Sequence, residues 1–327
     1  MTRTPAAAGA SSSLAGHLRD QRWIWAFAGA LAVWVAMGLV TNGVRLESLA
    51  SNGVAASFLI IAAIGQMYVV TSGRGAIDLS IPGVITLSAF VATGFIHGSD
   101  ARLLTGIPLI LVMGAAIGAV NGAVVLFLRI PPIIATLAIG YVLTTAALLY
   151  NQGFAVFRVS PLLTSLARGH LLAVPTIVLF ACGVAALAAL GLRRTVFGRS
   201  LLAIGQNLEA ARLAGIEVNR VQRVAYVVSG VCAALTGTLL SARVGGAFLG
   251  MGDSYLLESI AGGVIGGTLV FGGRSTTLGT MFGCLFLVLL VTAMQAAGFP
   301  IGTQNIVKGA LIVLVLIVAT ERPGGEA

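Results

Sequence analysis

Long apolar runs recur along the chain, separated by short polar stretches. A helix needs about 20 consecutive apolar residues to cross a bilayer, and the sequence supplies that length about ten times. The pattern predicts an all-α integral membrane protein with about ten transmembrane helices. The predicted spans are residues 23–41, 54–71, 82–97, 103–128, 133–151, 172–192, 222–242, 256–272, 277–297 and 304–320. The third is short for a full crossing, which indicates a tilt, a preceding broken segment, or both.

The polar stretches divide the chain into a membrane domain and its flanks. Residues 1–22, rich in Ala, Ser and Gly, predict a disordered cytoplasmic tail; residues 23–320 form a single transmembrane domain, and 321–327 a short cytoplasmic tail. Two connections exceed a tight turn. Residues 152–171 are expected on the outer side as a short helix or loop, and the arginine-rich segment 193–221 on the inner side.

Composition supports the membrane interpretation and changes how the net charge of +9 is understood. Charged residues make up 9% of the chain and hydrophobic residues 58%, whereas soluble domains carry about 25% charged residues. The cations are scattered between apolar runs and form no basic face, which argues against nucleic-acid binding. With the N-terminus inside and alternating spans, thirteen arginines lie inside and five outside. This bias predicts ten spans and two cytoplasmic termini.

Several chemistries lack their usual residues. A Walker A loop needs Lys followed by Ser or Thr, but the only lysine is Lys308, followed by Gly309. No metalloprotease motif or catalytic triad can be assembled from the three histidines, so we expect a transport subunit and no metal site. By the predicted spans no carboxylate lies deep in a helix, because Asp78 precedes a span while Asp253 and Glu258 flank the start of another. An ion-coupled carrier usually has such groups. Lys308 is predicted to anchor the chain near the outer surface.

Glycines recur at four-residue spacing within apolar runs, as in Gly114, Gly118 and Gly122, and again in Gly262 and Gly266. Small residues at this spacing let helix backbones approach closely in lipid. We therefore expect these positions to mark tight helix pairs.

The segment 193–221 contains signals for a short helix. Asn207 suits an N-cap, Glu209 places a negative charge in the first turn, and Gly215 suits the residue that ends the helix. Leu208 and Ala211 fall on one face. A short helix of two turns with a small apolar face is typical of a docking element; the alternative is a helix that lies against the membrane surface.

This segment, GRSLLAIGQNLEAARLAGI at 198–216, resembles the coupling loop of ABC importer permeases, in particular the branched-chain amino acid and monosaccharide permease superfamily. Three further stretches agree: GQMYVVTSGRGAIDLSIPGVITLSAF at 65–90, NGAVVLFLRIPPIIATLAIGYV at 121–142 and SIAGGVIGGTLVFGGRSTTLGTMFG at 259–283. The likeness covers about 45–320 in order. Asp-Leu-Ser at 78–80 favours the ribose-type sugar permeases, although Ser-Gly-Arg-Gly-Ala before Ile77 and Ile-Pro-Gly at 81–83 depart from that branch.

The resemblance implies a many-helix permease of the ribose and vitamin B12 importer type in the bacterial inner membrane. It implies that the permease works with a second copy or a close paralogue, with ABC ATPase subunits that carry the ATP and Mg²⁺, and with a periplasmic solute-binding protein. This chain itself would hold no cofactor. A monosaccharide or similar small polar solute is the expected cargo; a nucleoside, a branched-chain amino acid or an ion-coupled mechanism are the alternatives.

Two groups of residues are candidates for function. The resemblance assigns ATPase coupling to the motif residues Gly198, Arg199, Asn207, Glu209, Ala210, Ala211, Arg212 and Gly215. Asp78, Ser80 and Asn121 are the second group, for which a role in the solute pathway and a structural role in the turn or helix packing both stay open.

Overall fold

A computed structural model describes residues 23–40, 43, 46–153 and 158–320. The tails predicted at 1–22 and 321–327 lie outside these residues. The helices are α2 (Trp23–Val40), α3 (Leu46–Thr71), α4 (Ile81–Val91), α5 (Leu103–Phe127), α6 (Pro132–Gln152), α7 (Pro161–Arg168), α8 (Thr176–Arg194), α9 (Val196–Gln206), α10 (Leu208–Leu213), α11 (Val218–Val244), α12 (Tyr255–Ile265), α13 (Thr277–Ala296) and α14 (Ile301–Thr320). A π-helical turn, η1 (Ala92–Ile96), continues α4, and a 3₁₀ turn, η2 (Asp100–Arg102), precedes α5. One small hairpin pairs β1 (His170–Leu171) with β2 (Val174–Pro175).

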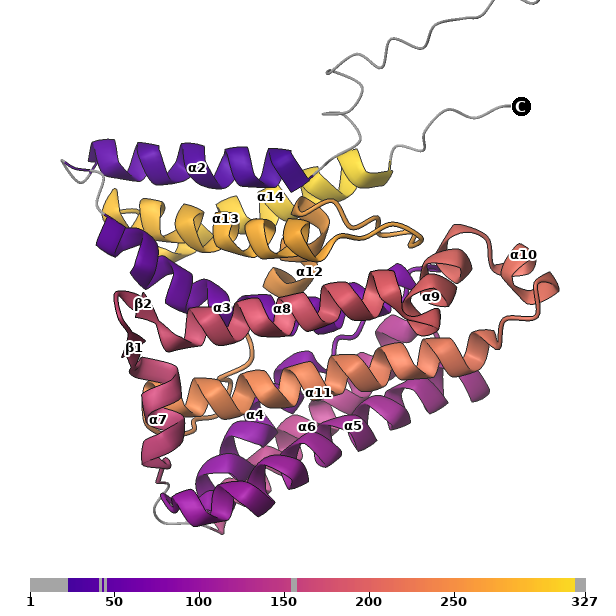
Figure 1. Cartoon of the computed structure of the whole chain (residues 1–327), viewed down its shortest axis with the longest axis horizontal. Helices are drawn as coiled ribbons and strands as arrows, with labels where there is room; N and C mark the ends of the chain where they lie inside the picture. The colour runs from indigo at the N-terminus through magenta and orange to yellow at the C-terminus, as the bar shows by residue number, and fades with distance from the viewer. Residues whose placement is uncertain (1–22, 41–42, 44–45, 154–157, 321–327) are drawn as a thin grey trace, which may run out of the picture.

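Ten of these elements are apolar enough for a membrane. Six, namely α3, α5 with η2, α6, α8, α11 and α13, are also long enough to cross it, and the shorter apolar helices are α2, α4 with η1, α12 and α14. The apolar stretch of α3 is 89% buried and that of α11 67%, whereas those of α5, α6 and α8 are 22–28% buried. α3 and α11 therefore form the centre of the bundle, and the other three present apolar faces outward (Figure 1).

Two of the predicted spans are broken helices. α4 and η1 are preceded by the non-helical turn at 72–80, as the short third span indicated. The predicted helix at 256–272 is wrong as a continuous span, because α12 ends at Ile265 and its 11 residues cover only about 16 Å. Gly267, Gly272 and Gly273 take positive φ and turn the chain. Non-helical backbone at this depth is tolerated where protein buries it or where it lines a cavity.

The spaced glycines lie at tight helix contacts, as predicted. A Cβ on Gly114 would lie 2.5 Å from the carbonyl oxygen of Gly230, and one on Gly118 would lie 2.2 Å from that of Tyr226, so α5 and α11 touch through their backbones. A Cβ on Gly262 would lie 2.5 Å from the Cys284 sulfur on α13. Only glycine fits these positions without moving a neighbouring helix.

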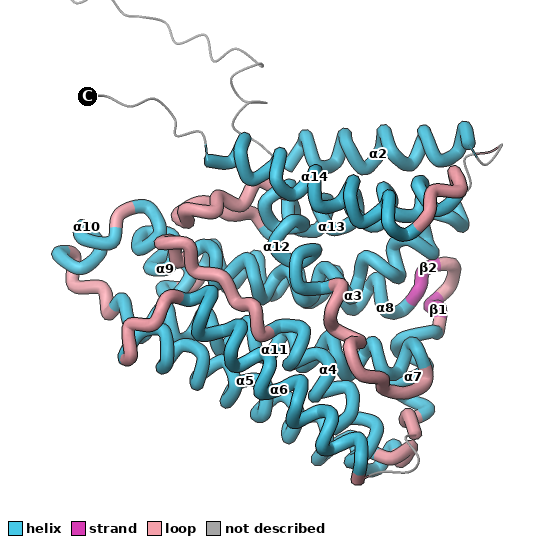
Figure 2. The backbone as a smooth tube through the Cα atoms, turned by 180° about the vertical axis from the view of Figure 1, so that it is seen from behind, coloured by secondary structure: helices cyan, strands magenta, loops and turns pink. Residues whose placement is uncertain are grey.

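The connections gather at two ends of the bundle. α10 and the turns at 72–76 and 129–131 line one cavity at one end of the bundle, and α9 lies beside α10 there (Figure 1); we call this the α10 end. The start of α2 and the end of α14 face the same way (Figure 1). At the opposite end, α7 and the hairpin fill the predicted outer connection (Figure 2). There Arg168 Nε donates to the Arg243 carbonyl at 2.8 Å.

Candidate coupling surface and buried polar cluster

α10 has the local structure that its sequence predicts. The Asn207 Oδ1 atom accepts a hydrogen bond from the Ala210 amide at 3.0 Å, which caps the helix. Glu209 lies in the first turn, and Gly215 takes a φ of +79° just after the helix. The N-cap and the glycine stop are therefore confirmed, while the role of this helix in docking stays a prediction.

The apolar face of α10 with Leu208 and Ala211, which the sequence marked as the docking face, is packed against this chain's own helices. Ala211 is buried in a small cluster with Ile204 of α9 and Val218 of α11, and Leu208 packs against the same cluster. A helix of six residues gains stability mainly from such packing. The face that remains for a partner is the opposite one, which includes Leu213, 91% exposed. Sequence reasoning missed Leu213 because the face that α10 buries depends on α9 and α11.

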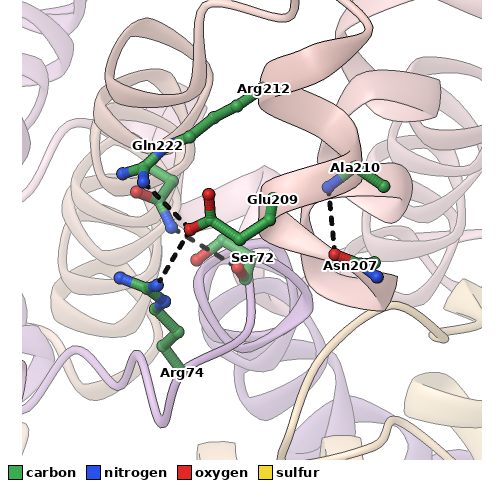
Figure 3. Close-up of polar contacts among 7 residues, drawn as sticks. All are labelled: Ser72, Arg74, Asn207, Glu209, Ala210, Arg212 and Gln222. Carbon is green, nitrogen blue, oxygen red and sulfur yellow. Dashed lines mark hydrogen bonds and ion pairs between the residues drawn. The ribbon is translucent and has the colours of Figure 1, made fainter.

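The exposed charges of α10 reach the turn that follows α3. Glu209 Oε1 lies 3.0 Å from Arg212 Nη1 and 3.8 Å from Arg74 Nη2 (Figure 3). Behind them, Gln222 Nε2 on α11 donates to the Ser72 carbonyl at 3.4 Å. These contacts join α10 and α11 to the non-helical segment that leads into α4.

α9 contacts both broken crossings at once. A Cβ on Gly205 would lie 2.1 Å from the Gly273 amide nitrogen and 2.1 Å from the Thr71 carbonyl oxygen. The Gly273 amide donates to that same Thr71 carbonyl at 3.0 Å, and Gln206 Nε2 donates to the Gly273 carbonyl at 3.3 Å. The end of α3, the loop after α12 and the end of α9 therefore meet at one point.

Gly198 and Arg199 of the predicted motif have different positions. Gly198 is buried, and a Cβ there would lie 2.2 Å from the Leu192 carbonyl oxygen, so this residue lets α9 turn back on α8. Arg199 is exposed on α9. Gly198 thus shapes the loop, and Arg199 lies on its exposed surface.

Asp78, Ser80 and Asn121 are brought together in a buried cluster. Asp78 accepts from the Ser80 amide at 3.0 Å, from Ser80 Oγ at 2.6 Å and from Ser229 Oγ of α11 at 2.7 Å. Asn121 Nδ2 of α5 donates to Ser80 Oγ at 2.7 Å. Asp78 therefore stabilises the turn before α4 and connects it to α5 and α11. This is the structural one of the two roles considered from the sequence; a role in solute passage stays a prediction.

This cluster also changes the picture of charge in the membrane. Ser229 lies 11 residues into α11, about 16 Å from its start, and Asn121 about 9 Å from the end of α5. Asp78 precedes a helix, as expected, but the non-helical turn carries it inward among α5 and α11, a depth that the sequence did not indicate. Among the described residues, no Lys or Arg pairs with it. Ser229 and Gln66, whose Oε1 accepts from the Asp78 amide, were missed, although polar residues within apolar spans were a signal.

A cavity of about 470 Å³ opens at the α10 end near this cluster. Arg74, Arg129 and Arg212 line it together with Gln222 and Tyr226. Tyr226 is buried, and its hydroxyl has no hydrogen-bond partner among the described residues. The cavity thus has a basic rim and reaches buried polar groups.

Lys308 is not a surface anchor. Its Nζ lies 3.1 Å from Glu258 Oε1, and each side chain is 22% exposed. Lys308 lies seven residues into α14, about 10 Å from its first residue, so this ion pair joins α12 to α14 inside the apolar layer.

The arrangement defines a class: a multi-pass membrane transport subunit with broken helices inside and a short helical surface element at one end. The family described as "Branched-chain amino acid transport system / permease component" matches residues 53–316, and the chain belongs to this family. A ribose import permease of Escherichia coli K12 is 35% identical over 80% of this chain and 82% of its own length. The Haemophilus influenzae ribose import permease is 30% identical over 79% and 80%. An autoinducer 2 import permease of Enterobacter sp. strain 638 is 30% identical over 92% and 87%. No solved structure matches the chain significantly.

These relatives are import permeases, in agreement with the prediction of a transport subunit rather than an enzyme. They also agree with the resemblance drawn from the four sequence motifs.

Proposed function

We propose that this chain is the membrane subunit of an ATP-driven importer for a monosaccharide or a similar small polar solute. The observation that carries the proposal is the joint contact of α9 and α10 with both broken crossings, in a chain that belongs to a permease family. The two ribose import permeases and the autoinducer 2 permease support a small polar cargo.

The geometry suggests how a partner drives the membrane domain. An ATPase subunit that binds the exposed face of α10 with Leu213, together with Arg199 of α9, would move α9 and α10 as one unit. Because Gly205 lies against Thr71 and Gly273, that movement reaches the segments leading into α4 and out of α12. Alternating access then follows if ATP-bound and free partners favour two different arrangements of these segments.

The orientation and the partners complete the proposal. The α10 end is proposed to face the cytoplasm of a bacterium, with both termini on that side, in keeping with the arginine bias. A second permease copy or close paralogue would cover the apolar faces that one chain leaves open. ATP and Mg²⁺ would bind to the ATPase subunits, and a periplasmic protein would deliver the solute.

The decisive experiment is reconstitution with the ATPase and the binding protein. A thermal-shift screen of the binding protein against monosaccharides, autoinducer 2, nucleosides and branched-chain amino acids identifies the solute. Uptake into proteoliposomes should then require ATP inside together with the binding protein. Uptake that needs an ion gradient and no ATP would contradict the proposal.

A further inference from the structure

The second broken crossing returns into the bundle after α11. From Gly245 the chain runs without helix to Ser254, and the Gly252 amide donates to Thr86 Oγ1 of α4 at 3.2 Å. A Cβ on Gly252 would lie 2.2 Å from the Pro82 carbonyl oxygen. The starts of α4 and α12 therefore touch, and Asp253 follows the contact directly.

This contact lies near the middle of the bundle. Thr86 is ten residues before the end of η1, about 15 Å along the helix. Gly83 packs on the carbonyl of Gly140, which is about 12 Å from the start and 18 Å from the end of α6. The apolar layer of a bilayer is about 30 Å thick. Both distances therefore place the contact, and Asp253 next to it, close to the midplane.

Asp253 opens onto a cavity. The cavity holds about 210 Å³ and is lined by Asp253 together with Tyr141 and Thr144 of α6, with Pro82 and Leu256 among its apolar walls. Asp253 is exposed, and among the described residues no Lys or Arg forms an ion pair with it. A charged group at this depth faces water or a partner rather than lipid, and it marks a functional site.

We infer that this cavity, which we call the Asp253 cavity, is a transit site for a neutral polyhydroxylated solute of monosaccharide size. Asp253 accepts hydrogen bonds from solute hydroxyl groups, and Tyr141 and Thr144 supply further hydroxyl contacts. The inference rests on the proposed function and names the residues that would contact the cargo.

The chemistry of the lining selects this class of solute. A carboxylate only accepts hydrogen bonds and repels anions, so it favours ligands rich in hydroxyl donors. The Thr144 hydroxyl donates to the Gly140 carbonyl at 3.0 Å and keeps its lone pairs free as acceptors. The volume is below the roughly 300–1,000 Å³ typical of sites for drug-sized ligands, which suits a small sugar. The apolar wall can contact its C–H faces.

The first arm of the test measures transport. The complete importer is reconstituted with Asp253→Asn, Asp253→Glu or, as a matched control, Glu47→Gln, which removes an exposed carboxylate at the start of α3. The substrate is tritiated D-ribose, or another monosaccharide if the binding-protein screen identifies one, at a limiting concentration. Asp253→Asn should lower uptake about tenfold, because the charge-assisted hydrogen bonds of a carboxylate contribute roughly twice as much as neutral ones. Asp253→Glu should recover part of the rate, and Glu47→Gln should match the parent.

The second arm measures water access and does not depend on transport. In a Cys182→Ala background, Asp253→Cys should react with a membrane-impermeant methanethiosulfonate. Leu187→Cys, at a 70% exposed position within α8, should resist it because it faces lipid. The folded state of each variant is checked by membrane abundance and gel filtration.

The outcomes separate the inference from the proposed function. If the parent importer transports the sugar while Asp253→Asn transports equally well, or if position 253 resists the reagent, the inference is overturned and the proposed function stands. A parent importer that takes up no monosaccharide overturns the proposed function and the sugar assignment with it.

Discussion

Substitution of Gly215 by valine isolates the geometry of α10 from its packing. Gly215 has a φ of +79°, and a Cβ added there would meet no atom within 4 Å. The penalty is therefore conformational, about 1–2 kcal/mol for an L-residue in the left-handed region. Two hydrogen bonds depend on this conformation, from the Gly215 amide to the Arg212 carbonyl at 2.9 Å and from the Ile216 amide to the Ala211 carbonyl at 3.1 Å. Valine relieves its strain by breaking them, which changes the direction in which α10 points.

The expected effect is a loss of coupling with an intact membrane domain. A cost of 1–2 kcal/mol changes a population by about 5–30-fold, so solute-stimulated ATP hydrolysis in the reconstituted importer should fall by that factor. Membrane abundance should not change. Gly215→Asn should retain most activity, because asparagine visits the left-handed region.

Gly183→Val is the matched control, since Gly183 lies on α8 without positive φ and with nothing within 4 Å of its Cβ position. Copurification of the ATPase provides a second measurement. If the importer with Gly215→Val binds the ATPase and supports ATP hydrolysis as the importer with Gly183→Val does, the end of α10 does not set the docking geometry, and the reasoning above is refuted.

Three further predictions follow from the contacts. Lys308→Gln should lower thermal stability because it leaves Glu258 without its partner between α12 and α14, whereas the double variant with Glu258→Gln should regain most of it. Each side chain is 22% exposed, so the loss should be smaller than the roughly 3–5 kcal/mol of a fully buried pair; equal melting temperatures for single variant and parent would contradict this role. Gly205→Ala should reduce ATP-driven uptake more than Glu209→Gln, because overpacking at a backbone contact costs about 1–3 kcal/mol while an exposed ion pair contributes about 0–1 kcal/mol. Equal uptake by the two variants would be evidence that the backbone contact of Gly205 does not carry the movement of α9. Reporter fusions at the two termini should both report cytoplasm, and opposite locations would rule out an even number of spans.

Local signals explain what the sequence could predict. The cap at Asn207 and the stop at Gly215 depend on their own neighbours, and the paired glycines such as Gly118 depend only on spacing. The length of the apolar runs predicted ten membrane elements, because the thickness of a bilayer sets a similar length for every span. These features need no knowledge of which helices touch.

The errors arose where one segment's structure depends on another. The buried position of Asp78 follows from a turn that α5 and α11 hold in place, so its own sequence neighbours could not reveal it. The end of α12 at Ile265 follows from glycines whose positive φ the apolar composition conceals. The pairing of Lys308 with Glu258 joins two elements 50 residues apart.

The same contacts decide how force can pass from the surface to the interior. The side chains of Glu209 and Arg74 lie 3.8 Å apart and are 68% and 65% exposed. Solvent screening therefore makes this ion pair weak, and it can hold α10 to the turn after α3 only loosely. The contact of Gly205 with Thr71 and Gly273 has no side chain between the backbones and therefore no flexible part that could absorb a movement. In the proposed mechanism, a small displacement of α9 would therefore shift both the turn before α4 and the loop after α12. Because α4 and α12 meet again beside the Asp253 cavity, such a movement would reach that cavity along two routes at once.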